Sequence, residues 1–144
     1  MKSFQEFLTE EKVLKQSRDL AEARSLMQQA WDRSNDLSSL PVDISNAQFR
    51  FESAYECLRE ALQSFLSFEG YKAYSHEAIV IFSLEKKILS EAQAVKIDRY
   101  RTIRNDINYR GKKITLEEAT EILHLVKSLL PLLRKILEEK LSKK

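Results

Sequence analysis

Residues 47–70 read AQFRFESAYECLREALQSFLSFEG. Apolar side chains recur in this stretch at intervals of three and four, which is the spacing of one face of an α-helix. The members of this face are Phe51, Ala54, Tyr55, Leu58, Ala61, Leu62, Phe65 and Phe68. Gly70 follows them and suits the left-handed conformation that often ends a helix. The stretch therefore predicts a long helix, about residues 47–69, that packs this face into a core.

Comparable patterns on both sides of this stretch predict further helices. Their expected ranges are about 4–15, 18–37, 75–87, 91–110 and 116–141. Ser17 is expected to cap the helix at 18–37, Ser45 with Gln48 the central one, and Thr115 with Glu118 the last. Pro131 lies inside the last helix and is expected to kink it near residues 126–127, because its ring removes one backbone hydrogen bond.

The chain contains two Gly and two Pro in 144 residues. An all-β fold needs turn residues at about every 8–12 positions, and an α/β fold needs β-branched runs between turns, so neither class fits. We expect an all-α, antiparallel up-and-down helical bundle with four to five main helices and a short one. Residues 1–144 are expected to form a single domain, with 1–16 a helical leader and 142–144 a frayed tail.

Composition narrows the classes of protein further. The chain has no apolar run of about 18 residues, so no transmembrane helix is expected. The first residues carry acids where a signal peptide needs an apolar stretch, and the single cysteine, Cys57, excludes an internal disulfide, so a cytoplasmic location is expected. Two distant His and one Cys have no metal-ligand spacing, and no glycine-rich phosphate loop is present, so no metal or cofactor is expected.

The net charge of +2 is unevenly distributed. Residues 86–113 hold nine Lys or Arg against three Asp or Glu. Such a segment in a nearly neutral protein indicates either a local site for anions, nucleic acid among them, or a solvated helix face.

The helix expected at 91–110 carries two stripes of different character. Tyr100, Ile103 and Ile107 form an apolar stripe that should face the bundle. Arg101, Arg104, Asn105 and Asn108 form a polar stripe, with Tyr109 near its edge. Two Asn inside a helix cost roughly 0.5 kcal/mol each relative to Ala. Arg is used at every basic position from 99 to 110, and its rigid fork suits phosphate. The polar stripe is therefore a candidate binding face.

Two segments resemble the HEPN superfamily, small helical bundle domains of toxin–antitoxin and RNA-cleaving systems. They are FESAYECLREALQSFLSFEGYKAYSHEAIVIF (51–82) and DRYRTIRNDINYRGKKITLEEA (98–119). The resemblance covers about residues 17–138. It implies a helical bundle that pairs as a homodimer through the helix at 91–110, with RNA or a nucleotide as the expected ligand.

The motif of active HEPN ribonucleases is Arg, a polar residue, and then His after about four to six intervening positions. Arg104 and Asn105 resemble its first half, whereas Tyr109, Arg110 and Gly111 occupy the positions open to the His. The resemblance thus implies Arg104, Asn105 and Tyr109 as catalytic positions, and Arg101, Asn108 and His76 as ligand-binding residues. His76, in YSHEA, has a second interpretation as support for a helix cap.

The missing His bears on the expected chemistry. RNA cleavage without metal needs a base, an acid and a cation for the developing charge. Arg104 suits the cation, but Tyr has an ordinary pKa near 10 and is a poor base at neutral pH. We therefore expect an anion-binding face with cleavage lost or slow.

Two hypotheses of different class remain. The first is a toxin-like, RNA-directed HEPN protein that works with a minimal nucleotidyltransferase. In a toxin subset that enzyme modifies a tyrosine two residues after the motif His, a position held here by Gly111. The second hypothesis is a non-catalytic helical module for protein interaction.

Overall fold

The computed structural model of the chain describes residues 2–143. This part forms six helices and two short strands: α1 (Phe4–Thr9), β1 (Val13–Lys15), α2 (Leu20–Ser38), α3 (Ala47–Glu69), β2 (Tyr71–Ala73), α4 (His76–Glu85), α5 (Glu91–Arg110) and α6 (Leu116–Ser142). The expected all-α bundle is confirmed. A two-stranded antiparallel sheet, which pairs Val13 with Ala73 and Lys15 with Tyr71, was not expected.

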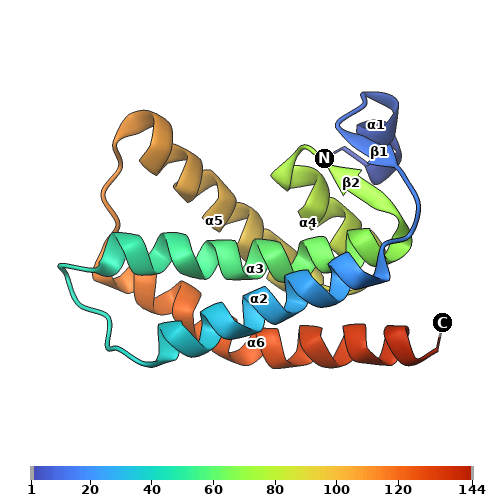
Figure 1. Ribbon diagram of the computed structural model, residues 1–144. Helices are drawn as coiled ribbons and strands as arrows, with labels where there is room; N and C mark the ends of the chain where they lie inside the picture. Colours follow the sequence, from blue (N-terminus) through green and yellow to red (C-terminus); the bar gives the residue numbers. More distant parts are fainter. Residues whose placement is uncertain (1, 144) are drawn as a thin grey trace.

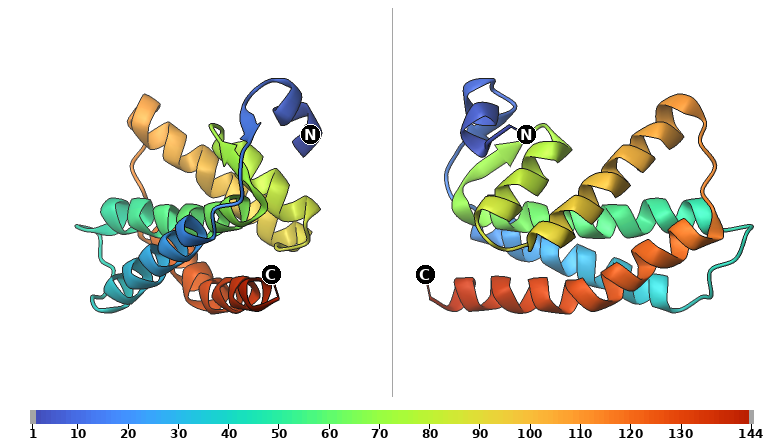
Figure 2. Two further views of the ribbon diagram at one scale, coloured as in Figure 1. Left: turned by 45° about the vertical axis from the view of Figure 1, so that its right-hand side comes forward. Right: turned by 180° about the vertical axis from the view of Figure 1, so that it is seen from behind.

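Helix α3 lies in the middle of the arrangement (Figure 1). Helices α4 and α5 lie on one side of it, and α2 and α6 lie on the other, as the further views in Figure 2 also show. The small sheet and α1 sit together at the end of α3 where that helix stops. The surface formed by α4 and α5 and the surface formed by α2 and α6 therefore lie on opposite sides of α3.

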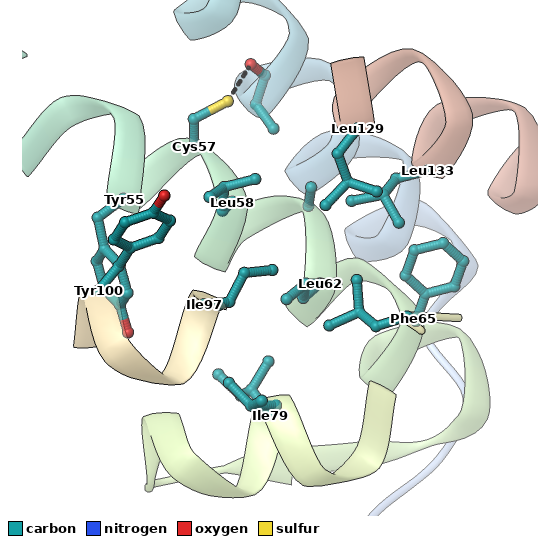
Figure 3. Close-up of a cluster of buried hydrophobic side chains, with 14 of the residues drawn as sticks. Tyr55, Cys57, Leu58, Leu62, Phe65, Ile79, Ile97, Tyr100, Leu129 and Leu133 are labelled. Atoms are coloured by element: carbon teal, nitrogen blue, oxygen red, sulfur yellow. Dashed lines mark hydrogen bonds between the residues drawn. The ribbon is translucent and has the colours of Figure 1, made fainter. Parts of the chain in front are cut away.

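The core is built around α3 because its apolar residues are not confined to one face. The predicted face is buried throughout, and Cys57, Leu66 and Ser64 on other sides of the helix are fully buried as well. Figure 3 shows Leu58, Leu62 and Phe65 of α3 among Ile79, Ile97, Leu129 and Leu133 from three other helices. The apolar contacts of α3 therefore hold both layers of helices together.

The boundaries of α3 and α5 agree with the predicted ranges. Gly70 (φ 94°) and Gly111 (φ 66°) follow these helices in the left-handed conformation, as expected. The start of α3 differs from the expectation. Ser45 donates its hydroxyl to Asp43, whose carboxylate also accepts from the backbone N–H of Ser45 and Asn46. Asn46 occupies the cap position, but its side chain bonds Pro41 and Asp43 rather than the first turn of α3, so the predicted Ser45–Gln48 capping box is wrong.

The predicted cap of α2 is also wrong. Asp19, not Ser17, caps the helix by accepting from the N–H of Glu22 at 2.9 Å. The reason lies in the preceding segment, which runs along the end of α3. Gln16 donates to the carbonyl of Gly70 (2.8 Å) and Asp19 to that of Ser67 (2.9 Å), so the chain stays extended past Ser17.

The leader does not form one helix over residues 4–15. Helix α1 ends at Thr9, and Val13–Lys15 pair with β2 instead. Phe4 packs edge-on against Tyr71 and Phe82, each at 5.1 Å between ring centroids. Val13 is fully buried in the same cluster, a position that pairing with β2 provides.

The remaining caps follow the expected chemistry. Thr115 and Glu118 form the predicted capping box of α6. Ser75 caps α4, which ends at Glu85, two residues earlier than expected. Ser90 and Gln93 form a capping box at α5 that was not predicted.

Helix α6 continues through Pro131, and Figures 1 and 2 show it changing direction midway along its length. Pro131 has no N–H for the carbonyl of Lys127, which accounts for the bend. Of the expected frayed tail, Ser142 ends α6, Lys143 is its C-cap, and Lys144 lies outside the described residues. None of the helices in residues 2–143 has a stretch long and apolar enough to span a bilayer.

The two glycines offer a matched test of this packing. A Cβ on Gly70 would lie 2.6 Å from the carbonyl oxygen of Gln16, whereas a Cβ on Gly111 would meet no atom within 4 Å. Both substitutions introduce left-handed strain of about 1–2 kcal/mol. Gly70→Ala should add the backbone clash and cost at least about 3 kcal/mol in total. Urea unfolding of both variants measures the difference, and equal losses would contradict the close approach of residues 16–19 to α3.

Candidate functional site

Tyr100 fixes the position of α5 against the bundle. Its ring is fully buried and packs edge-on against Phe51 of α3, with 5.9 Å between centroids. Its hydroxyl donates to Glu121 of α6 at 2.7 Å. The predicted apolar stripe is confirmed, because Ile107 is buried and Ile103 packs against the core. With the apolar stripe packed against the core, part of the polar stripe faces the space between α3 and α4.

The residues of the polar stripe do not share one environment. Arg101, Arg104 and Asn105 are partly buried, whereas Asn108 is exposed. Tyr109 has 85 % of its surface exposed and makes no aromatic or cation–π contact within residues 2–143. Both figures show the last part of α5, which carries Tyr109, standing away from α3 (Figures 1 and 2).

Arg104 contacts α3 at the aromatic ring of Tyr55. Its guanidinium carbon lies 5.6 Å from the ring centroid of Tyr55, a cation–π geometry. Tyr55 is itself 2 % exposed, and burial raises the pKa of its hydroxyl to about 12, although Arg101, Arg104 and Arg59 oppose that change. The phenol is therefore neutral over the physiological range, and it holds the arginine in place.

His76 joins this group from a third helix. It is the first residue of α4, and its ring lies 6.2 Å from that of Tyr55, tilted by 41°. Burial lowers the pKa of His76 below its ordinary value, and the positive charges of Arg59, Arg104 and Arg101 lower it further. The imidazole is thus mostly neutral near pH 7, and the nearby carboxylate of Glu56 only partly offsets the three arginines. Its position supports the interpretation of His76 as a member of the polar site, while Ser75 makes the cap bond of α4.

We call Tyr55, Arg59, His76, Arg101 and Arg104 the arginine cluster. Its three cations differ in how far they are neutralised. Arg59 bonds Glu56 through two nitrogens, and Arg101 bonds Asp98 at 2.8 Å. Within residues 2–143, Arg104 forms no ion pair with a carboxylate. The cluster therefore offers an incoming anion one guanidinium that no carboxylate of residues 2–143 contacts directly, although Glu56 is near enough for Arg104 to lower its pKa.

This arrangement favours binding of an oxyanion. Guanidinium groups donate to phosphate in fixed, paired geometry, and the N-terminal end of α4 adds a partial positive charge. His76 supplies a neutral imidazole that can accept a proton at neutral pH. Residues 2–143 contain no group of three His, Cys, Asp or Glu arranged to hold a metal ion.

The other two reactive candidates have ordinary structural surroundings. Cys57 is buried, donates to the backbone carbonyl of Ala30 at 3.2 Å, and burial raises the pKa of its thiol to about 12 (Figure 3). Cys57 is therefore part of the core. His124 lies exposed on α6, which runs on the other side of α3 from α4 and α5.

Sequence reasoning missed two members of the arginine cluster. Tyr55 was assigned to the core face, and Arg59 was not singled out. The signal was present, because Arg59 lies four residues after Tyr55 and so shares its side of the helix. Their meeting with Arg104 and His76 depends on how α4 and α5 cross α3, which local patterns do not specify.

Comparison of the chain with protein-family models, with curated proteins and with solved structures found no match. The HEPN resemblance and the roles it implies for Arg104, Asn105 and Tyr109 therefore stay predictions.

The lowered pKa of His76 makes a testable link between pH and stability. In the unfolded chain His76 takes up a proton at its ordinary pKa of about 6.5, whereas in the folded protein it does so at lower pH. The unfolded state thus binds more protons, and the folded protein loses stability as pH falls through that window. His76→Gln should remove this loss, so its unfolding free energy should fall less than that of the parent between about pH 7.5 and about pH 5.

Urea unfolding at both pH values measures this effect. His124→Gln, an exposed histidine on α6, is the matched control for the loss of one imidazole. Equal changes in the pH profile of both variants would show that the arginine cluster is not the cause.

Proposed function

We propose that this protein is a HEPN-like helical domain that binds RNA through phosphate groups at the arginine cluster. The observation that carries the proposal is Arg104, which lies beside Arg59, Arg101 and His76 and forms no ion pair with a carboxylate within residues 2–143. Three cations around a half-buried imidazole repel one another, and a bound anion relieves that repulsion.

RNA rather than an isolated phosphate is supported by the charge along α5. The basic segment continues beyond the cluster through Arg110, Lys112 and Lys113, which lie at or just after the exposed end of that helix. Arg110 and Lys112 also contact carboxylates, Asp106 at 3.9 Å and Glu118 at 3.3 Å, which phosphates would have to displace or share. A flexible single strand can follow such a row of cations while one phosphate occupies the cluster. A nucleotide shares the phosphate chemistry but reaches fewer of these charges.

Cleavage is expected to be lost or slow. By the resemblance, the positions open to the family's His hold Tyr109, Arg110 and Gly111, and Tyr109 is exposed at the outer end of α5. His76 is the histidine beside the arginines, and it comes from α4 instead. Any proton transfer at this site would therefore run through His76 rather than Tyr109.

A non-catalytic module for protein interaction is the alternative. It is favoured by exposed apolar side chains around the start of α3, where Ile44 is 86 % and Phe49 is 72 % exposed. The homodimer through α5 and the nucleotidyltransferase partner stay predictions that rest on the resemblance.

Binding is tested with a fluorescein-labelled single-stranded RNA and fluorescence anisotropy. Arg104→Ala should weaken binding roughly three- to tenfold, because it removes a charge-assisted contact to phosphate. Arg134→Ala is the matched control, since Arg134 also lies over an aromatic ring, 4.2 Å from Trp31, but on the other side of α3. Equal affinity of the parent and Arg104→Ala would refute the proposed binding site.

Cleavage is tested separately with a mixed RNA pool in the presence of a metal chelator. We expect the parent to leave the pool intact over hours, because the motif His is missing. Cleavage that disappears in both Arg104→Ala and His76→Ala but persists in Tyr109→Phe would reveal a working ribonuclease that uses His76. Cleavage that all variants share would indicate a contaminating nuclease.

A further inference from the structure

A second site lies on the opposite side of α3 from the arginine cluster. Helices α2 and α6, together with the segment that follows α2, border a cavity of about 420 Å³ that is open to solvent on one side. Its apolar walls include Trp31 and Leu37 of α2 and Leu123 and Leu130 of α6. Volumes of this order accommodate a small molecule, and they are too small for a folded partner or a strand of nucleic acid.

The structure of α6 accounts for the cavity. Pro131, which lines it, gives the carbonyl of Lys127 no helical donor, and α6 changes direction in this region (Figure 1). Trp31 forms one wall of the cavity, and the guanidinium of Arg134 lies over its indole ring, 4.2 Å from the ring centroid. The backbone carbonyl of Trp31 accepts from the hydroxyl of Ser34 at 2.7 Å. The cavity therefore has a fixed aromatic wall.

The polar side chains that the structure describes at the cavity include a cation but no carboxylate. Lys127 and His124, one helical turn apart on α6, are exposed at its edge. Within the described chain, none of the side chains that line the cavity is a carboxylate. An anionic head would thus find a cation at the edge and no opposing charge, while an apolar body would occupy the interior.

We infer that this cavity binds a small amphipathic carboxylate, with its apolar body between α2 and α6 and its carboxylate beside Lys127. The carboxylate gains a charge-assisted contact with the ammonium, and the body loses contact with water. The inference is independent of the proposed RNA site, since the two share no residue.

Trp31 makes the inference measurable, because it is the single tryptophan of the chain. The probes are octanoate, octanol and octylamine, which share one alkyl chain and carry a negative, a neutral and a positive head at pH 7. Each is titrated into the full chain while Trp31 fluorescence is recorded. We expect octanoate to shift the emission at the lowest concentration, octanol next and octylamine last. Equal responses to all three, or no response to octanoate, would overturn the assignment.

Variants locate the site. Lys127→Ala should abolish the preference for octanoate over octanol, a change of roughly three- to tenfold in relative affinity. Lys135→Ala, an exposed lysine elsewhere on α6, should keep the preference. Ser34→Phe should fill the cavity and weaken both ligands, and circular dichroism checks its fold. An unchanged preference in Lys127→Ala would overturn the inference even if Ser34→Phe does not fold.

Discussion

The burial of α3 over most of its circumference is the constraint on which the rest of the structure depends. A surface helix buries one stripe, but 15 of the 23 residues of α3 are buried. Helices on both sides are therefore needed to cover it, and they come from sequence before and after it. The polar residues enclosed with it need partners inside the protein. Glu60 accepts from Arg33 of α2 at 3.0 Å, and the hydroxyl of Ser64 donates to the carbonyl of Ala61.

The same constraint gives the molecule two sides of different character. Tyr55 and Arg59 leave α3 toward α4 and α5, where Arg104 and His76 approach them. On the other side, α2 and α6 meet α3 but leave a cavity beside Trp31. Neither side depends on the other for its groups, because α3 stands between them. One helix thus lies between a cluster of charged side chains on one side and an apolar cavity on the other.

The fold could be predicted from the sequence where the signals are local. The periodicity of residues 47–69, the glycines after α3 and α5, and the Thr115–Glu118 capping box each act within a few residues of the chain. The failures arise from contacts that are distant in sequence. Val13 forms a strand because Ala73 lies beside it, and Ser17 stays outside α2 because residues 16–19 bond the end of α3. The site divides in the same way: the stripe of Arg101 and Arg104 was visible on one helix, whereas Arg59 enters through packing.

The charges of the arginine cluster link the binding of an anion to the protonation of His76. Glu56 and Asp98 neutralise two of the three guanidinium groups, so the net excess resides near Arg104. Burial is the main cause of the lowered pKa of His76, and the charges of Arg59, Arg104 and Arg101 lower it further against the opposing charge of Glu56. A phosphate bound there would oppose the three cations and raise that pKa toward its ordinary value. By linkage, a proton on His76 must strengthen phosphate binding by the same factor. If the proposed phosphate binds at the arginine cluster, its binding and proton uptake by His76 would therefore strengthen each other.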